Sequence, residues 1–165
     1  MSTPENSKTE APVRKILLIL SKATLDNVYA AFILANGARM EGIEAEIFFT
    51  FFGLEAVNKE RMNHLHVATV GNPAMHMPTM IGGLPGMEAV ATRMMKKEME
   101  KLDIPEIEEF LEILSASGVK LWACKLALDM FHLEEKDLFE EMDGVLTVGG
   151  FYDRAKGEGT QLLFV

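Results

Sequence analysis

Residues 14–50 read RKILLILSKATLDNVYAAFILANGARMEGIEAEIFFT, and this stretch decides the fold. Residues 16–20 are continuously apolar, which is typical of a parallel strand covered on both faces. From Leu25 to Met40 the apolar residues recur at helical spacing, and residues 43–50 form a second strand-like run. The order strand, helix, strand predicts a βαβ unit with parallel strands and a right-handed crossover.

The rest of the chain continues this alternation. We expect three more strands, several helices and one tight turn: strands at 119–123, 145–148 and 161–165, helices at 54–58, from 87, from 105 to Gly118, at 124–131 and at 134–141, and a turn at Gly149-Gly150. Five parallel-type strands between helices predict an α/β fold. The predicted architecture is a three-layer α/β/α sandwich with a mainly parallel five-stranded sheet.

The length of 165 residues suits one domain with a proper core. We expect a disordered N-terminal tail at 1–13 and a single α/β domain at 14–165. The longest apolar runs, 16–20 and 47–52, are too short to cross a bilayer, so no membrane association is expected. The first dozen residues are polar and carry no apolar stretch typical of a secretory signal.

The chain is acidic, with 16 basic and 25 acidic residues and a net charge of −9. This balance argues against binding to nucleic acid or to anionic lipid. The acidic residues cluster late in the chain, where solvated helix faces are the simplest interpretation. A basic protein partner stays open.

Cys124 is the only cysteine. It follows an apolar strand-like run and opens a helix-like one, which predicts a position at the carboxyl end of the sheet, where open α/β folds build their sites. The N–H groups at a helix start favour a negatively charged sulfur. A single unpaired cysteine excludes an intramolecular disulfide framework and is compatible with a cytoplasmic location.

The residues around Cys124 leave its role open. Ala127 and Leu128 fall on the same helical face, so the sulfur could equally be a small buried hydrophobe. Lys125 adds positive charge nearby, and Asp129 is expected to point elsewhere on the helix. Without a second cysteine, a dithiol cycle is disfavoured.

Two other features suggest sites less strongly. Residues 62–80 hold several Met and His residues, including Met75-His76-Met77, but their spacing demands no metal, so no metal site is predicted. The pairs Gly82-Gly83 and Gly149-Gly150 match neither a dinucleotide fingerprint nor a P-loop. We therefore expect no cofactor.

Four stretches resemble the DsrE/DsrF/DsrH-like family of small sulfur-relay proteins, in particular its larger stand-alone DsrE-like members. They are ILLILSK at 16–22 with Leu25-Asp26, FTFFG at 49–53, LWAC at 121–124 with LDM at 128–130, and GV at 144–145 with VGG at 148–150. The resemblance spans about residues 14–165. Phe52 stands where Trp is commoner in the family, and Ala127 where relatives often carry Ser.

The resemblance implies a three-layer α/β/α fold and a homo- or hetero-oligomer. Some members accept sulfane sulfur on the matching cysteine as a persulfide and pass it to another thiol. On this basis Cys124 is the expected carrier, in a cytoplasmic, homo-oligomeric sulfurtransferase-like protein whose partners are protein donor and acceptor thiols. The expected pocket residues, from neighbouring strand ends and the helix start, are Lys125, Phe51, Phe52, Gly149 and Gly150.

Two other functions stay possible. One is a non-catalytic oligomeric binding module in which Cys124 is structural. The other is peroxide reduction, which is weaker because the Pro-x-x-x-Thr-x-x-Cys arrangement of peroxiredoxins does not precede Cys124.

Overall fold

Five parallel strands form the sheet at the centre of the computed structural model, which describes residues 12–70 and 78–165. The strand order is β4-β3-β2-β1-β5. The strands are β1 (Lys15–Leu20), β2 (Glu44–Phe49), β3 (Lys120–Cys124), β4 (Gly144–Leu146) and β5 (Thr160–Phe164). The predicted α/β fold with a five-stranded parallel sheet is confirmed. The predicted tail at 1–13 lies, up to residue 11, outside the described residues.

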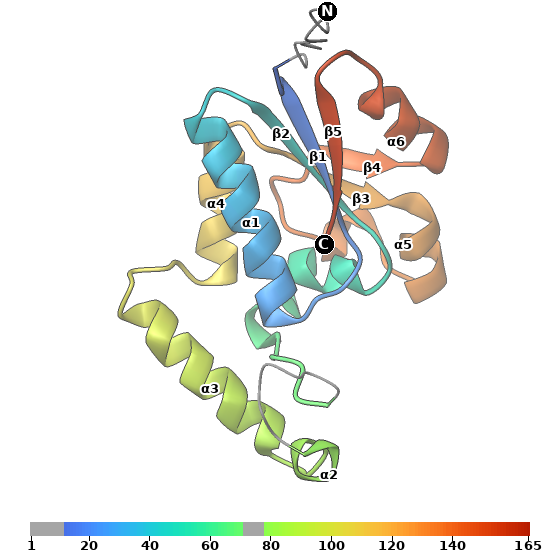
Figure 1. Cartoon of the computed structure of the whole chain (residues 1–165). Coiled ribbons are helices and arrows are strands. Elements are labelled where there is room, and N and C mark those ends of the chain that lie inside the picture. Colours follow the sequence, from blue (N-terminus) through green and yellow to red (C-terminus); the bar gives the residue numbers. More distant parts are fainter. Residues whose placement is uncertain (1–11, 71–77) are drawn as a thin grey trace, which may run out of the picture.

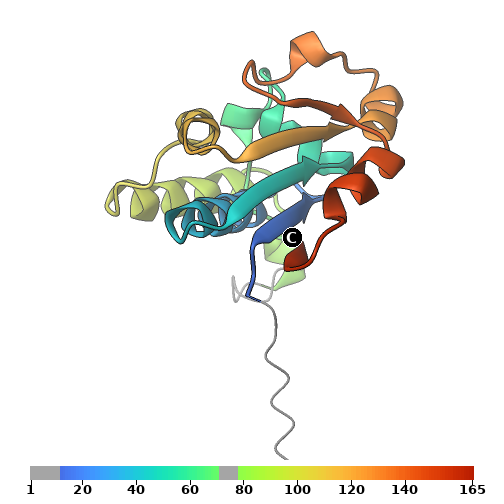
Figure 2. The ribbon, with the colours of Figure 1, turned by 90° about the horizontal axis from the view of Figure 1, so that it is seen from above.

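Helices cover both faces of this sheet and make three layers (Figures 1 and 2). On one face lie α1 (Leu25–Met40) and α4 (Ile107–Ala116), and on the other lie α5 (Lys125–Phe131) and α6 (Val148–Ala155). The short α2 (Thr79–Gly82) and α3 (Met87–Glu100) extend away from the sheet (Figure 1). Within the described residues, no helix combines the length and the apolar character needed to span a bilayer.

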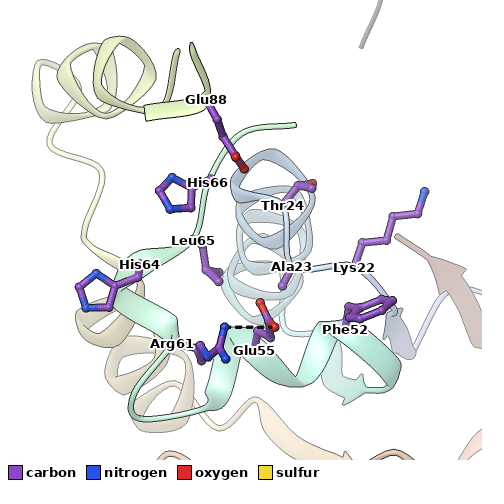
Figure 3. Close-up of a pocket in the computed structure, with 10 residues that line it drawn as sticks. All are labelled: Lys22, Ala23, Thr24, Phe52, Glu55, Arg61, His64, Leu65, His66 and Glu88. Atoms are coloured by element: carbon purple, nitrogen blue, oxygen red, sulfur yellow. Dashed lines mark ion pairs between the residues drawn. The ribbon is translucent and has the colours of Figure 1, made fainter. Parts of the chain in front are cut away.

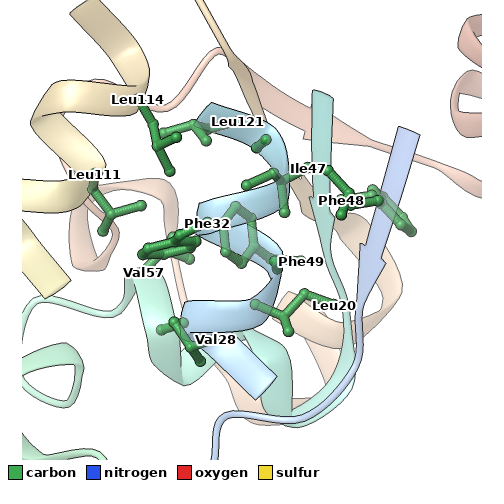
Figure 4. Close-up of a cluster of buried hydrophobic side chains, with 14 of the residues drawn as sticks. Leu20, Val28, Phe32, Ile47, Phe48, Phe49, Val57, Leu111, Leu114 and Leu121 are labelled. Atoms are coloured by element: carbon green, nitrogen blue, oxygen red, sulfur yellow. The ribbon is translucent and has the colours of Figure 1, made fainter. Parts of the chain in front are cut away.

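The core under α1 is aromatic at its centre. The ring of Phe32, which is fully buried, meets Phe49 of β2 at 6.5 Å and Phe110 of α4 at 5.5 Å, both edge to face. Figure 4 shows Phe32 and Phe49 among the aliphatic side chains that α4 and the strands contribute. Burying one such ring stabilises the fold by about 1.5–3 kcal/mol. The apolar residues whose spacing predicted α1 therefore form the buried face of this helix.

On the opposite face, a buried carboxylate joins three strands to α6. Glu46 of β2 is 4% exposed and accepts hydrogen bonds from Trp122 of β3, at 2.7 Å, and from Arg154 of α6. Lys15 of β1 lies 2.5 Å from the same carboxylate. Arg154 also lies over the Trp122 ring, 4.3 Å from its centroid. Burial by itself raises the pKa of Glu46, but the hydrogen bonds from Arg154, Lys15 and Trp122 outweigh it, so the pKa lies below its usual range.

The prediction of a tight turn at Gly149-Gly150 is wrong, because both glycines lie in the first turn of α6. The hydroxyl of Thr147 accepts a hydrogen bond from the N–H of Gly150, at 3.2 Å, and so caps this helix. The preceding strand, predicted at 145–148, accordingly ends at Leu146. A Thr three residues before the capped N–H was the signal for a helix start.

The acidic helix predicted at 134–141 is also wrong. Only a 3-10 turn, η4 (Glu135–Asp137), forms there, because the next residues pair with another segment instead. Leu138 bridges to Asn58, and the N–H of Phe139 donates to the carbonyl of Val57 at 2.7 Å. Leu138 and Phe139 are buried by this pairing, so tertiary packing overrides the local helical pattern.

Candidate functional site

Cys124 occupies the junction that the sequence predicted. It is the last residue of β3, pairs in register with Leu146 of β4, and is the N-cap of α5. The connection after β2 leads to α4 on one face of the sheet, whereas β3 leads directly to α5 on the other (Figure 1). Crevices in open α/β sheets form at the carboxyl ends of strands whose connections part in this way. The topology therefore places the sulfur where such folds bind ligands.

A cavity of about 380 Å³ lies beside Cys124, and we call it the Cys124 cavity. The Cys124 residue is only 5% exposed, yet it is part of the cavity wall. The other wall residues come from the end of β2 and from α5: Thr50, Phe51, Leu126, Ala127, Asp129 and Met130. The wall is mainly apolar, so the thiol is shielded by carbon groups but lies at the edge of a space that opens to solvent.

Phe51 reaches this cavity because of how η1 (Phe51–Val57), a 3-10 helix, follows β2. A Cβ on Gly53 would lie 2.0 Å from the backbone oxygen of Leu20, so only glycine allows η1 to pass this close to the end of β1. Phe51 itself has φ 47°, a left-handed conformation that is uncommon for a large side chain. Its side chain is half-exposed at the cavity wall.

Phe52 does not line the Cys124 cavity. Its ring packs on Phe131 at the end of α5, with 5.5 Å between the ring centroids, and it is 61% exposed. It lines two neighbouring cavities instead. Of the two predicted phenylalanines, Phe51 therefore lines the Cys124 cavity, whereas Phe52 packs on Phe131 of α5.

The charged residues of α5 are arranged differently from the sequence prediction. The predicted pocket residue Lys125 is not in the cavity wall, whereas Asp129, expected to point away, is part of it. Lys125 and Asp129 form an ion pair across one helical turn. The Asp129 carboxylate in the cavity wall is thus paired with Lys125, the first residue of α5.

Gly149 and Gly150 are not among the residues that line the Cys124 cavity. They follow β4, the strand next to β3, and lie in α6. The sequence prediction instead missed Leu126 and Met130, which are 65% and 47% exposed and line the cavity. Two large apolar side chains four residues apart on an otherwise polar helix face were the signal for them.

The Met/His-rich segment shows no metal centre in its described part. Across residues 12–70 and 78–165, no group of three or more His, Cys, Asp or Glu side chains is arranged to hold an ion. Met62 is buried in the core, while His64 and His66 are exposed. The Met75-His76-Met77 run lies outside the described residues.

A family model, described as the DsrE/DsrF/DrsH-like family, matches residues 12–163. The chain belongs to this family. It is also 35% identical over 162 residues to the "Sulfur carrier protein DsrE2" of Allochromatium vinosum, which covers 92% of this chain and 98% of that protein. The uncharacterized protein YrkE of Bacillus subtilis is 29% identical over 135 residues, which are 79% of this chain and 84% of YrkE. The family resemblance predicted from the four sequence stretches is confirmed.

Two solved structures share the fold. MTH1491 of Methanobacterium thermoautotrophicum, a protein of unknown function, superposes with a TM-score of 0.56 at 13% identity and covers 92% of this chain and 98% of its own. The ychN protein of E. coli gives the same TM-score at 15% identity and covers 92% and 99%. At such low identity these two structures support the DsrE-like fold alone.

Proposed function

We propose that this protein carries sulfane sulfur as a persulfide on Cys124 and passes it to the thiol of a partner. The observation that carries the proposal is the position of the only cysteine, at a strand-to-helix junction in the wall of an apolar cavity. The similarity to a sulfur carrier over almost the whole chain supports the same reading.

The chemistry is two displacements at sulfur. The Cys124 thiolate attacks the outer sulfur of a donor persulfide, a new S–S bond forms, and the donor leaves as its thiolate. An acceptor thiolate then attacks the outer sulfur of the Cys124 persulfide, and Cys124 leaves as a thiolate. The sulfur moves at the sulfane level in both steps, so no external oxidant or reductant is consumed.

The geometry suits an intermediate that must last between two encounters. Carbon-lined walls from Phe51, Leu126 and Met130 limit the access of water and oxidants to the sulfur. A volume of about 380 Å³ leaves room for one further sulfur atom and for the tip of an incoming thiol. The first N–H groups of α5, as in any helix, lack intrahelical acceptors and point toward the N-cap residue. They favour the negative charge of a persulfide.

We assign the relay to the cytoplasm, because a single unpaired cysteine suits a reducing compartment. The donors and acceptors we expect are protein thiols, and the family resemblance favours a homo-oligomer. The net charge of −9 favours a partner with a basic face. Asp129, which is in the cavity wall and paired with Lys125, is an acidic residue that such a partner would contact.

The alternative is a binding module in which Cys124 is inert. The 5% exposure of Cys124 and its contacts within the hydrophobic core favour this second function. The two functions differ in the reactivity of the thiol. An inert core cysteine reacts slowly with alkylating reagents and gains no sulfur from a donor.

The test is intact-mass measurement after incubation with a persulfide donor. Wild-type protein is expected to gain the mass of one sulfur atom, and the Cys124→Ser variant is expected to gain none. Because the chain holds one cysteine, no second thiol can give the signal. A wild-type protein that gains nothing while still folded would support the inert module.

A further inference from the structure

A second cavity lies away from Cys124, at the carboxyl end of β1, and we call it the β1 cavity. Its volume is about 490 Å³, within the range of small-molecule sites. It is bounded by the loop between β1 and α1, by η1 and the segment after it, and by the start of α3 (Figure 3). Neither the sequence motifs nor the proposed relay assigns it a role.

The wall of this cavity carries six ionisable side chains. They are Lys22, Arg61, His64, His66, Glu55 and Glu88. Figure 3 shows the Glu88 carboxylate and His66 above Arg61 and Glu55, with His64 to one side and the Lys22 side chain extending outward on the other. Four groups that can be cationic and two carboxylates are suited to a ligand that itself carries charges of both signs.

Within the described residues, four of these six groups have no partner and the other two are only loosely paired. Arg61 has one ion pair in the described structure, with Glu55, at a long N–O distance of 3.9 Å. The side chains of Lys22, His64, His66 and Glu88 form no hydrogen bond or ion pair with any residue in the described part of the chain. Within residues 12–70 and 78–165, no side chain therefore neutralises these four charges.

The backbone beneath the two imidazoles is held firmly. Leu65, between them, is 4% exposed, so its neighbours His64 and His66 are both directed outward. The carbonyl of His66 accepts a hydrogen bond from the first N–H of α1, on Leu25, at 2.9 Å, and the N–H of Val67 donates to Thr92 of α3 at 3.0 Å. The segment that carries both imidazoles is thus hydrogen-bonded to α1 and to α3.

A third, smaller cavity of about 160 Å³ lies between the β1 cavity and the Cys124 cavity. It shares Phe52, Glu55 and Arg61 with the first and Phe51 with the second. The three cavities are therefore neighbours along η1. The cavity between them thus connects the wall of the β1 cavity to that of the Cys124 cavity through residues of η1.

We propose that the β1 cavity binds the charged end of a small peptide thiol or persulfide, a molecule with carboxylate groups and an ammonium group. Arg61, Lys22 and the imidazoles bind the carboxylates, and Glu88 or Glu55 binds the ammonium group. This inference rests on the proposed relay, and it adds to the protein thiols a class of small molecule that exchanges sulfur with Cys124 on one side of that relay. The transfer is the same displacement at the outer sulfur, with the peptide thiolate as leaving group or nucleophile.

The probe is S-methylglutathione, a tripeptide thioether with two carboxylates and an ammonium group that cannot exchange sulfur. Calorimetric titration of the full chain is expected to show saturable binding. Arg61→Ala is expected to weaken it about tenfold or more, the effect of losing one charge-assisted hydrogen bond. Lys156→Ala, an exposed lysine of comparable charge outside the cavity, is the matched control and is expected to change nothing.

Three further titrations test whether binding depends on both charge types of the probe and not on Cys124. N-acetylation of the probe is expected to weaken binding, and sodium sulfate at equal concentration is expected not to displace it. Cys124→Ser is expected to bind the probe as the wild type does. Absence of saturable binding, or binding that Arg61→Ala leaves unchanged or sulfate fully displaces, would overturn the inference.

Failure of the two proposals can be told apart. If an inorganic polysulfide loads Cys124 while the thioether does not bind, the relay stands and the peptide-thiol site does not. If the thioether binds as predicted while no donor loads Cys124, the relay fails and the cavity is a binding site only.

Discussion

The close passage of η1 past the end of β1 makes Gly53→Ala the most informative single substitution. The added Cβ would lie 2.0 Å from the backbone oxygen and 2.7 Å from the carbonyl carbon of Leu20. Backbone must therefore move by about 1 Å before the contact becomes tolerable, and neither atom belongs to a flexible side chain. We expect a loss of unfolding free energy of about 3 kcal/mol, at the upper end of overpacking costs.

The matched control is Gly37→Ala, since Gly37 lies inside α1 and a Cβ there would meet nothing within 4 Å. Removing a glycine from a helix interior stabilises it by about 0.5–1 kcal/mol. Urea unfolding would measure the free energy of unfolding of both variants. In thermal unfolding, the melting temperature of the Gly53 variant is expected to fall by about 6–12 °C. A Gly53→Ala protein as stable as the wild type would refute the argument that this glycine lets η1 take its place beside Phe51.

Further predictions concern the buried carboxylate and the rim of the Cys124 cavity. The pKa of Glu46 is lowered in the fold, so its contribution is present above its unfolded pKa and is lost as the pH falls through the folded value. Glu46→Gln is expected to cost about 3 kcal/mol at pH 7, because it leaves Arg154 and Lys15 without their counter-ion. Urea unfolding at pH 7 and pH 4 should show a smaller pH dependence for this variant, whereas Glu44→Gln, on the same strand but exposed, should behave like the wild type. Asp129→Asn removes the carboxylate from the cavity wall, so alkylation of Cys124 by anionic iodoacetate should speed up more than alkylation by neutral iodoacetamide. Equal changes for the two reagents would argue against a field from Asp129. Phe51→Ala should uncover the thiol and raise both alkylation rates by about threefold or more. Leu102→Ala, an exposed apolar residue far along the chain from the cavity, should leave both rates unchanged.

The sheet was predictable because its strands are patterned locally. Continuous apolar runs bounded by polar turns gave β1, β2 and β3 to within a residue or two, and the helical spacing of α1 gave its ends at Leu25 and Met40. The same patterning placed Cys124 at the junction of β3 and α5. These are features that depend on residues near one another in the chain.

The parts that could not be predicted depend on distant contacts. The helix expected at 134–141 is replaced by pairing with Asn58, about eighty residues earlier, which no local pattern shows. The position of Asp129 in the cavity wall depends on how α5 docks on η1, and the split between Phe51 and Phe52 depends on the left-handed turn at Phe51. The capping position of Thr147 indicates the start of α6, but two successive glycines favour a turn when only their local sequence is considered.

The most direct test of the relay follows one sulfur atom through Cys124 in both directions. Protein loaded with a persulfide donor is freed of excess donor, weighed intact, mixed with an acceptor thiol and weighed again. A wild-type chain that becomes heavier by one sulfur atom and then returns to its original mass, as the acceptor gains that sulfur, would agree with a carrier. A mass that never rises, or an adduct that no thiol removes, would contradict it.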